Sequence, residues 1–229
     1  MIGIIPAGGK STRINGLPKY LLPVSGGYLL ERLVNQMPAD RVIVAANPVN
    51  FDLLCSYAPN GAAVTSIDSV SMSAALLSIG SSHNAISSDE MVLFGMPDTY
   101  WTDADTYGRL IETLLDGADV AVAVWRIRDE QRGNLGQCSV VEDNRIESVI
   151  DKDSECPLIY AWGAMAWRRS FWAHIHAHDA HLGIALTRAI SAGLSVTAVP
   201  MSGNYYDCGT PDEYFRCIRE TTEVIHATI

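Results

Sequence analysis

The first residues with chemical potential form a glycine-rich loop behind an apolar N-terminal run. The segment reads Ile5-Pro-Ala-Gly-Gly-Lys-Ser-Thr-Arg13. A glycine pair lets backbone N–H groups approach a phosphate or a base without interference from a Cβ atom. We therefore expect Ala7, Gly8 and Gly9 to contact a nucleotide. Arg13 adds a planar guanidinium that can bind a triphosphate through two hydrogen bonds.

A proline-flanked lysine follows this loop in Pro18-Lys-Tyr-Leu-Leu-Pro-Val24. Lys19 supplies a compact positive charge for a phosphate. Two commoner phosphate loops are excluded, because a Walker A motif would need glycine in place of Ile4 and because no GxGxxG fingerprint occurs. A tight turn without a ligand is the plain alternative, and the nearby lysine segment disfavours it.

Two aspartates stand where ligands of a metal ion are expected. Asp98 follows the apolar run Met91–Met96 and so lies at the carboxyl end of a predicted strand, the edge at which open α/β sheets bind ligands. Asp207 ends another short β run and precedes a Gly-Thr-Pro turn. The two carboxylates could converge on one Mg²⁺, a hard ion that takes oxygen ligands. Each aspartate alone could also be a simple turn residue.

Together these segments resemble the sugar-1-phosphate nucleotidyltransferases, among them the glucose-1-phosphate thymidylyl- and uridylyltransferases. The resemblance extends over most of the chain, in short segments that are widely separated. It is specific near the two ends of the chain. It lies in Ala7-Gly-Gly-x-x-Thr-Arg13, Pro18-Lys-x-Leu-Leu-Pro-Val24, Gly95-Met-Pro-Asp98, Asp151-Lys152 and Tyr206-Asp-Cys-Gly-Thr-Pro-Asp212.

The resemblance implies an enzyme in which an acceptor phosphate oxygen attacks the α-phosphorus of an NTP in line and pyrophosphate leaves. Positioning and charge neutralisation would carry the catalysis. Asp98 and Asp207 are the implied Mg²⁺ ligands. The implied catalytic residues are Arg13 on the triphosphate, Lys19 near the α-phosphate, and Asp98.

On the acceptor side, the resemblance assigns the phosphate to Lys152 and the hydroxyls to Asp151 and to backbone near Gly136 and Gly163. Asp151 stands where the family usually has glutamate, so its reach is one methylene shorter. A lysine between two aspartates could also be an ordinary exposed residue.

The stretch Ser69–Ala75 lacks the glutamine with which the family often reads a pyrimidine, so the base stays open. Met72 in this stretch is expected to contact the nucleotide. One alternative acceptor class is non-sugar: an alditol phosphate, phosphocholine or a phosphonate joined to CMP. An alternative of another kind is a catalytically silent domain that senses a nucleotide or sugar.

The hydrophobic rhythm predicts the elements that position these residues. Short buried runs alternate with amphipathic helical stretches, which predicts an α/β fold with a three-layer, doubly wound, mostly parallel mixed sheet; the resemblance implies its Rossmann-like nucleotidyltransferase form. Strands are expected at Met1–Pro6, Arg41–Ala46, Ala63–Ile67, Met91–Met96, Val120–Trp125, Tyr160–Trp167 and Ser195–Pro200. Helices are expected at Leu29–Met37, Phe51–Tyr57, Ser73–Ile79, Thr106–Leu115, near Phe171, Gly183–Ala192 and Pro211–His226.

The pattern of alternating strands and helices changes at Gly136. The runs Gln137–Glu142 and Arg145–Asp151 flank the turn signal Asp143-Asn144 and predict a hairpin, part of a small β-rich acceptor sub-lobe. Without a linker or repeat, residues 1–229 are expected to form one domain. Residues 1–135 would mainly bind the nucleotide and residues 136–229 mainly the acceptor.

Composition limits the partners and the compartment. A formal net charge of -10 over 229 residues argues against binding nucleic acid or an anionic membrane. The partners it leaves open are small molecules and further copies of the chain. Five scattered cysteines without a CxxC pair, and no signal or membrane segment, favour the cytoplasm. Four histidines between His174 and His181 are interpreted as a solvated loop, with a metal site as the minor alternative.

Overall fold

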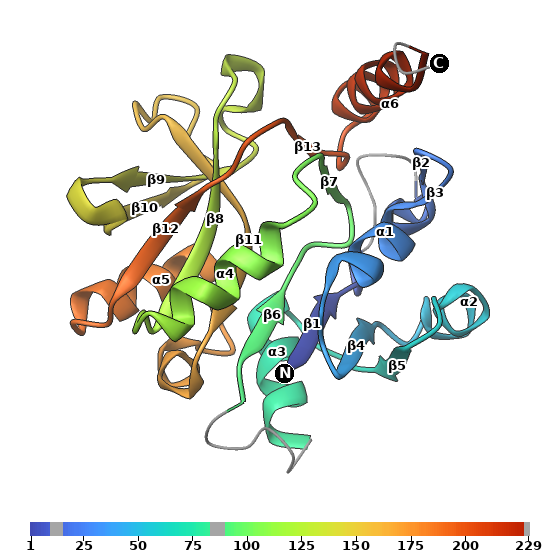
Figure 1. The fold of residues 1–229 in the computed structure, drawn as a ribbon. Coiled ribbons are helices and arrows are strands. Elements are labelled where there is room, and N and C mark those ends of the chain that lie inside the picture. Colours follow the sequence, from blue (N-terminus) through green and yellow to red (C-terminus); the bar gives the residue numbers. More distant parts are fainter. Residues whose placement is uncertain (10–15, 83–89, 227–229) are drawn as a thin grey trace.

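The described residues of the chain form a nine-stranded mixed sheet. The computed structural model describes residues 1–9, 16–82 and 90–226. The strands are β1 (Ile2–Pro6), β4 (Arg41–Ala46), β5 (Ala62–Ser66), β6 (Val92–Phe94), β8 (Val120–Arg126), β9 (Gly136–Val140), β10 (Ile146–Asp151), β11 (Tyr160–Trp167) and β12 (Val196–Pro200). Their order is β10-β9-β11-β6-β1-β4-β5, and β8 and β12 extend the sheet from β11 (Figure 1). Strands β10 and β11 run opposite to the others.

Helices cover both faces of this sheet and give three layers. They are α1 (Leu29–Gln36), α2 (Phe51–Tyr57), α3 (Met72–Ser82), α4 (Thr106–Leu115) and α5 (Leu182–Ser191). Helix α6 (Pro211–His226) instead contacts the short strands Pro23–Val24 and Tyr205–Asp207. Leu33 of α1 and Leu110 of α4 belong to one hydrophobic core, whereas Leu76 of α3 and Leu186 of α5 belong to the core on the opposite face (Figure 1). The prediction of a three-layer α/β fold with a mostly parallel sheet is confirmed.

Strand β1 shows why the central strands were recognisable. All five of its residues are buried. Ile2 and Ile4 point into one core and Ile5 into the other, as the twofold periodicity of a strand requires. A parallel strand covered by helices on both faces reads as a continuous apolar run, and this pattern predicted β1, β4 and β8.

Most predicted elements occur with boundaries shifted by a few residues or fewer. Strand β6 is shorter than its apolar run, and the segment near Phe171 is a 3-10 helix, Arg169–His174, instead of an α-helix. The predicted turn of the β9–β10 hairpin is present, with Asp143 and Asn144 both in the left-handed region at φ 59° and 58°. Aspartate and asparagine tolerate this conformation better than most residues.

Two small sheets lie beside the main one. One joins β2 (Pro23–Val24) to β3 (Gly27–Tyr28), and the other joins β7 (Thr99–Trp101) to β13 (Tyr205–Asp207).

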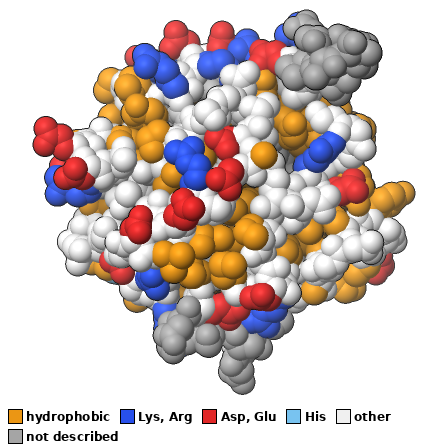
Figure 2. Space-filling view, viewed as in Figure 1, with side chains coloured by type: hydrophobic (Ala, Val, Ile, Leu, Met, Phe, Trp, Pro, Cys, Tyr) orange, Lys and Arg blue, Asp and Glu red, His pale blue; other side chains and the backbone are white. Residues whose placement is uncertain are grey.

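Acidic and basic side chains are interspersed on the face of the molecule shown in Figure 2. None of the described helices combines the length and the apolar composition that crossing a membrane requires.

Candidate active site

The β7–β13 sheet brings the two predicted metal ligands together. Asp98 directly precedes β7, and the antiparallel register pairs Asp207, the last residue of β13, with Thr99. The carboxylates of Asp98 and Asp207 therefore lie on neighbouring strands although they are far apart in sequence. Burial raises the pKa of the Tyr205 hydroxyl well above its ordinary value, and the negative charges of both aspartates add to this shift.

Lys19 joins this pair of carboxylates. It begins the 3-10 helix Lys19–Leu21, and its Nζ lies 3.2 Å from Oδ2 of Asp98, with both side chains largely buried. A Cβ atom on Gly209 would lie 2.7 Å from Oδ1 of Asp207 and 3.1 Å from Nζ of Lys19. One ammonium and two carboxylates thus converge at a single point.

A cavity of about 320 Å³ opens at the carboxyl ends of β1 and β4. Of the predicted nucleotide-binding residues, Gly8, Gly9 and Met72 line it. Ala7 does not: it is buried, and its N–H donates to the Ala45 carbonyl at 2.7 Å, so it extends the sheet. Arg13 lies outside the described residues.

A smaller cavity, of about 140 Å³, is lined by Asp98 and Asp207. All four residues predicted to bind the acceptor line it: Gly136, Asp151, Lys152 and Gly163. Met72 and Met96 line both cavities, so the cavities adjoin. The two aspartates therefore line a cavity that adjoins the one lined by Gly8 and Gly9.

Asp151 is the unusual group of the smaller cavity. Its Oδ1 accepts a hydrogen bond from Nε1 of Trp162 at 3.3 Å, whereas its buried Oδ2 faces the backbone of Gly183 and accepts no hydrogen bond from a described side chain. Burial raises the pKa of this carboxyl, opposed by His181 and by the Trp162 N–H. A Cβ atom on Gly136 or Gly183 would overlap the carboxylate, so only glycine leaves room for this arrangement.

Lys152 follows β10 in a strained conformation. Its φ of 56° lies in the left-handed region, and its N–H donates to the Leu135 carbonyl at 3.2 Å. Left-handed residues other than glycine cost free energy and cluster at binding sites. The strain turns the chain at the edge of the smaller cavity, where the side chain of Lys152 contributes to the wall.

The sequence matches the family of the MobA-like NTP transferase domain over residues 3–194. The chain belongs to this family. The match confirms the prediction that the chain is a nucleotidyltransferase enzyme. No curated protein matches the sequence significantly.

Solved structures show the same fold at low identity. A UTP-bound UGPase from Acinetobacter baumannii is 15% identical with a TM-score of 0.76, covering 96% of this chain and 92% of its own. A putative glucose-1-phosphate thymidylyltransferase from Bacillus anthracis is 18% identical with a TM-score of 0.78, over 96% and 95%. A UDP-glucose pyrophosphorylase complexed with UDP-glucose is 14% identical at 0.78, over 97% and 98%. The fold is thus that of the sugar-1-phosphate nucleotidyltransferases, as the resemblance implied.

Some residues of this nucleotidyltransferase site escaped the sequence reasoning. Asn47 lines the larger cavity, and its Nδ2 donates to the Gly8 carbonyl at 2.8 Å. Its place directly after β4, at the carboxyl edge of a parallel strand, was a usable signal. Asn134 lines the smaller cavity but lies in loop sequence without any motif, and His181, which also lines it, was interpreted only as part of the histidine-rich loop.

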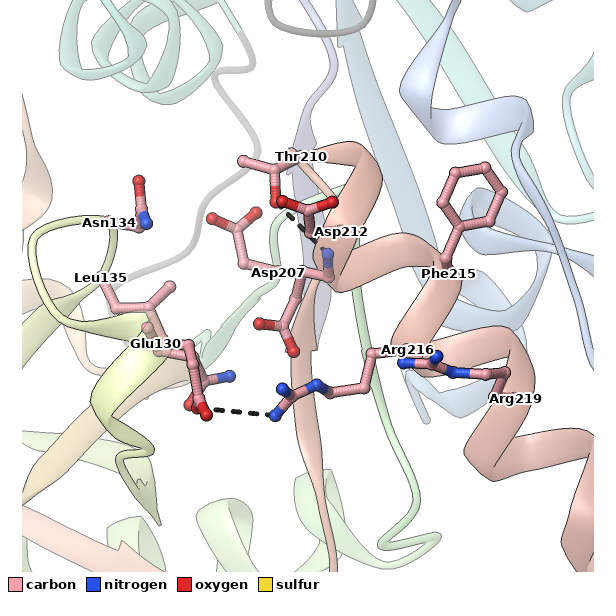
Figure 3. Close-up of a pocket in the computed structure, with 11 residues that line it drawn as sticks. Glu130, Asn134, Leu135, Asp207, Thr210, Asp212, Phe215, Arg216 and Arg219 are labelled. Carbon is pink, nitrogen blue, oxygen red and sulfur yellow. Dashed lines mark hydrogen bonds and ion pairs between the residues drawn. The ribbon is translucent and has the colours of Figure 1, made fainter.

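A third and larger cavity, of about 590 Å³, adjoins the site at Asp207 and lies between α6 and the 3-10 helix Asp129–Gln131. Figure 3 shows Asp207 and Thr210 at one end of it and Arg216 and Arg219 at the other. Four carboxylates and two guanidinium groups line it, so the lining as a whole is acidic.

The histidine-rich segment contains one group of potential metal ligands among the described residues. Ligand atoms of His176, His178 and Asp179 lie within 4.8 Å of one another. However, both oxygens of Asp179 accept hydrogen bonds from the Arg188 guanidinium, at 2.8 and 3.1 Å. Because these hydrogen bonds occupy both oxygens of Asp179, they favour a loop anchored by Arg188 over a metal site in this nucleotidyltransferase.

Proposed function

We propose that this nucleotidyltransferase joins the nucleotidyl group of an NTP to a sugar 1-phosphate and releases pyrophosphate. The observation that carries the proposal is the convergence of Lys19, Asp98 and Asp207, in which the two aspartates line the smaller of two adjoining cavities. One cavity would take the NTP and the other the acceptor, so the acceptor phosphate and the α-phosphorus would meet at these charges.

The donor chemistry at this point suits a magnesium ion. Asp98 and Asp207 offer carboxylate oxygens on neighbouring strands, and Mg²⁺ is commonly held by one or two carboxylates together with substrate phosphates. When bound there, Mg²⁺ would supply positive charge to the phosphate oxygens. Lys19 would hold the Asp98 carboxylate in place and contribute its own charge near the α-phosphate.

The cavity of about 320 Å³ at the carboxyl ends of β1 and β4 would hold the NTP. Gly8 and Gly9 would present their backbone to the phosphates, and the stretch 69–72 would lie beside the base. We retain Arg13 as the residue on the triphosphate, on the sequence argument alone.

Replacing Gly9 by alanine tests this role with little risk to the fold. A Cβ atom there would meet no heavy atom of the described residues within 4 Å, and the φ of Gly9 is not positive. We expect an unchanged melting temperature but a KM for the NTP raised about tenfold, because the methyl group stands where a phosphate approaches the backbone. Thermal unfolding and initial rates measure both. Wild-type kinetics in this variant would contradict a close approach of the NTP at Gly9.

In the smaller cavity, Lys152 would bind the acceptor phosphate and Asp151 would read a hydroxyl. The buried Oδ2 of Asp151 accepts no hydrogen bond from a described side chain, so this carboxylate can accept one from a ligand. A hydroxyl of a sugar would satisfy it, and a site built for such a bond rejects analogues that lack the hydroxyl. His181 would add a further polar group to the wall of this cavity.

The deciding experiment is pyrophosphate release from a matrix of NTPs and phosphorylated acceptors with Mg²⁺. We expect release only with a sugar 1-phosphate, and with one base strongly preferred. Release only with alditol phosphate, phosphocholine or a phosphonate would support the cytidylyltransferase alternative. Nucleotide binding without release of pyrophosphate for any acceptor would support the sensing role.

The described residues include only free cysteines, in keeping with the cytoplasm as the proposed location.

A further inference from the structure

The strand that carries Asp207 has little support from the main sheet. Strand β13 has three residues and, among the described strands, pairs only with β7. A two-stranded ribbon is marginally stable by itself. The position of the Asp207 carboxylate therefore depends on what holds the other edge of β13.

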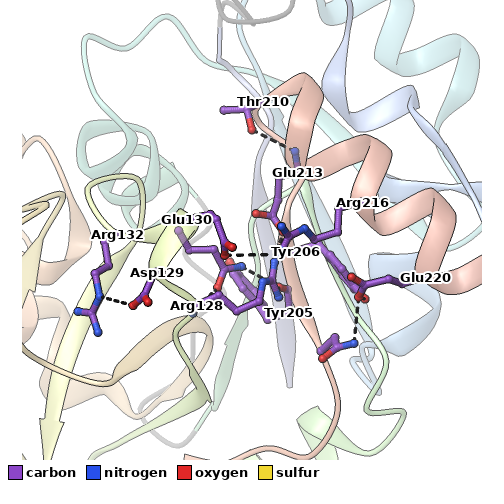
Figure 4. A network of polar contacts seen from close by, with 12 residues as sticks. Arg128, Asp129, Glu130, Arg132, Tyr205, Tyr206, Thr210, Glu213, Arg216 and Glu220 are labelled. Carbon is purple, nitrogen blue, oxygen red and sulfur yellow. Dashed lines mark hydrogen bonds and ion pairs between the residues drawn. The ribbon is translucent and has the colours of Figure 1, made fainter.

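Two donors from one short segment hold that edge. Arg128 donates from Nη1 to the Tyr205 carbonyl at 3.2 Å (Figure 4). Gln131 donates from Nε2 to the same oxygen at 2.9 Å. The Tyr205 carbonyl lies two residues before Asp207. Gln131 is itself fixed, because its Oε1 accepts the Arg128 backbone N–H at 3.1 Å and because it is buried.

Arg128 also reaches the helix that follows Asp207. Its Nη2 pairs with the buried Glu213 in the first turns of α6, and its guanidinium lies 5.4 Å from the centre of the Tyr206 ring (Figure 4). The contacts of one side chain therefore bracket Asp207 on both sides in sequence. A planar guanidinium can make all of these contacts at once, which lysine cannot.

We propose that Arg128 and Gln131 are positioning residues that hold Asp207 in register with Asp98. The proposal rests on the proposed function, in which both carboxylates bind the metal ion. Residues that orient metal ligands without touching the metal are commonly worth 10- to 100-fold in affinity or activity. The opposing view is that Arg128 merely fastens α6 to the domain, in which case its loss would lower stability alone.

Arg128→Gln, with Arg216→Gln as its matched control, separates these two roles. Arg216 also joins α6 to the segment 129–131, through a 3.5 Å ion pair with Glu130, but it makes no bond to Tyr205. Each variant would be titrated with Mn²⁺, followed by electron paramagnetic resonance of the free ion, and its melting temperature recorded. Hydrogen exchange of the amides of residues 204–209 would be measured in parallel without metal.

We expect Arg128→Gln to weaken Mn²⁺ binding about tenfold and to speed exchange in residues 204–209, whereas Arg216→Gln changes neither. Arg128→Lys keeps the charge with a single donor group and should fall between the two, which covers the case in which Arg128→Gln does not fold. Unchanged exchange and unchanged Mn²⁺ affinity in both Arg128 variants, with only a lower melting temperature, would overturn the positioning role. Wild-type protein that binds no Mn²⁺ would refute the proposed metal site instead, and the exchange data would still decide whether Arg128 holds β13.

Discussion

Replacing Asp98 or Asp207 by asparagine is expected to lower kcat about 100- to 1000-fold while the protein stays folded. Asparagine keeps the shape of the side chain but removes the negative charge that a hard divalent ion requires. A metal that neutralises phosphate charge contributes several kcal/mol to the transition state, and a loss of about 3–4 kcal/mol corresponds to this range. Steady-state kinetics across a range of Mg²⁺ concentrations, with circular dichroism of each variant, measure the effect.

A matched surface substitution makes this result specific. Asp52→Asn changes the charge by the same amount on the exposed face of α2, away from all three cavities, and should leave kcat unchanged. Because Asp98 also pairs with Lys19, Lys19→Ala should lower kcat less in the Asp98→Asn variant than in the wild-type protein. Near-normal activity of both asparagine variants at limiting Mg²⁺ would show that any metal binds elsewhere.

The sequence was informative wherever burial imposes a pattern. The apolar runs of β1, β4 and β8 and the amphipathic faces of α1 and α4 follow from packing between layers, so their types and approximate bounds could be predicted. The glycine pair and the lysine segment were recognisable because phosphate binding restricts both the backbone and the charge.

The pairing of β7 with β13, and the meeting of Asp98 and Asp207 that follows from it, could not be predicted in this way. Strands β7 and β13 have three residues each, too few for a periodic signal, and their pairing joins distant parts of the chain. That Asp98 and Asp207 meet was therefore only a possibility from their places at strand ends, which the family resemblance favoured. The places of His181 and Asn134 in the smaller cavity depend on loop paths, and the clamp of Arg128 on Tyr205 depends on one carbonyl that no sequence pattern marks.

Replacing Lys152 by glycine is expected to lower kcat/KM for the acceptor about 10- to 100-fold without destabilising the fold. The left-handed φ of 56° costs a lysine about 1–2 kcal/mol, which glycine avoids, while the greater freedom of glycine in the unfolded chain costs about 0.5–1 kcal/mol. The free energy of unfolding should therefore change little or rise slightly. A lost charge-assisted hydrogen bond to a phosphate, worth about 1.5–3 kcal/mol, accounts for the kinetic loss.

Asp143→Gly supplies the control for strain, since Asp143 has a φ of 59° at the exposed tip of the β9–β10 hairpin and lines none of the three cavities. It should gain stability in the same way and keep its acceptor kinetics. Calorimetric NTP affinity without acceptor should equal the wild-type value in both variants, because Lys152 does not line the NTP cavity. Unchanged acceptor kinetics in Lys152→Gly would make this lysine an ordinary exposed residue. A lower NTP affinity would move its charge to the triphosphate, so the two-substrate measurement assigns the lysine to one phosphate or to neither.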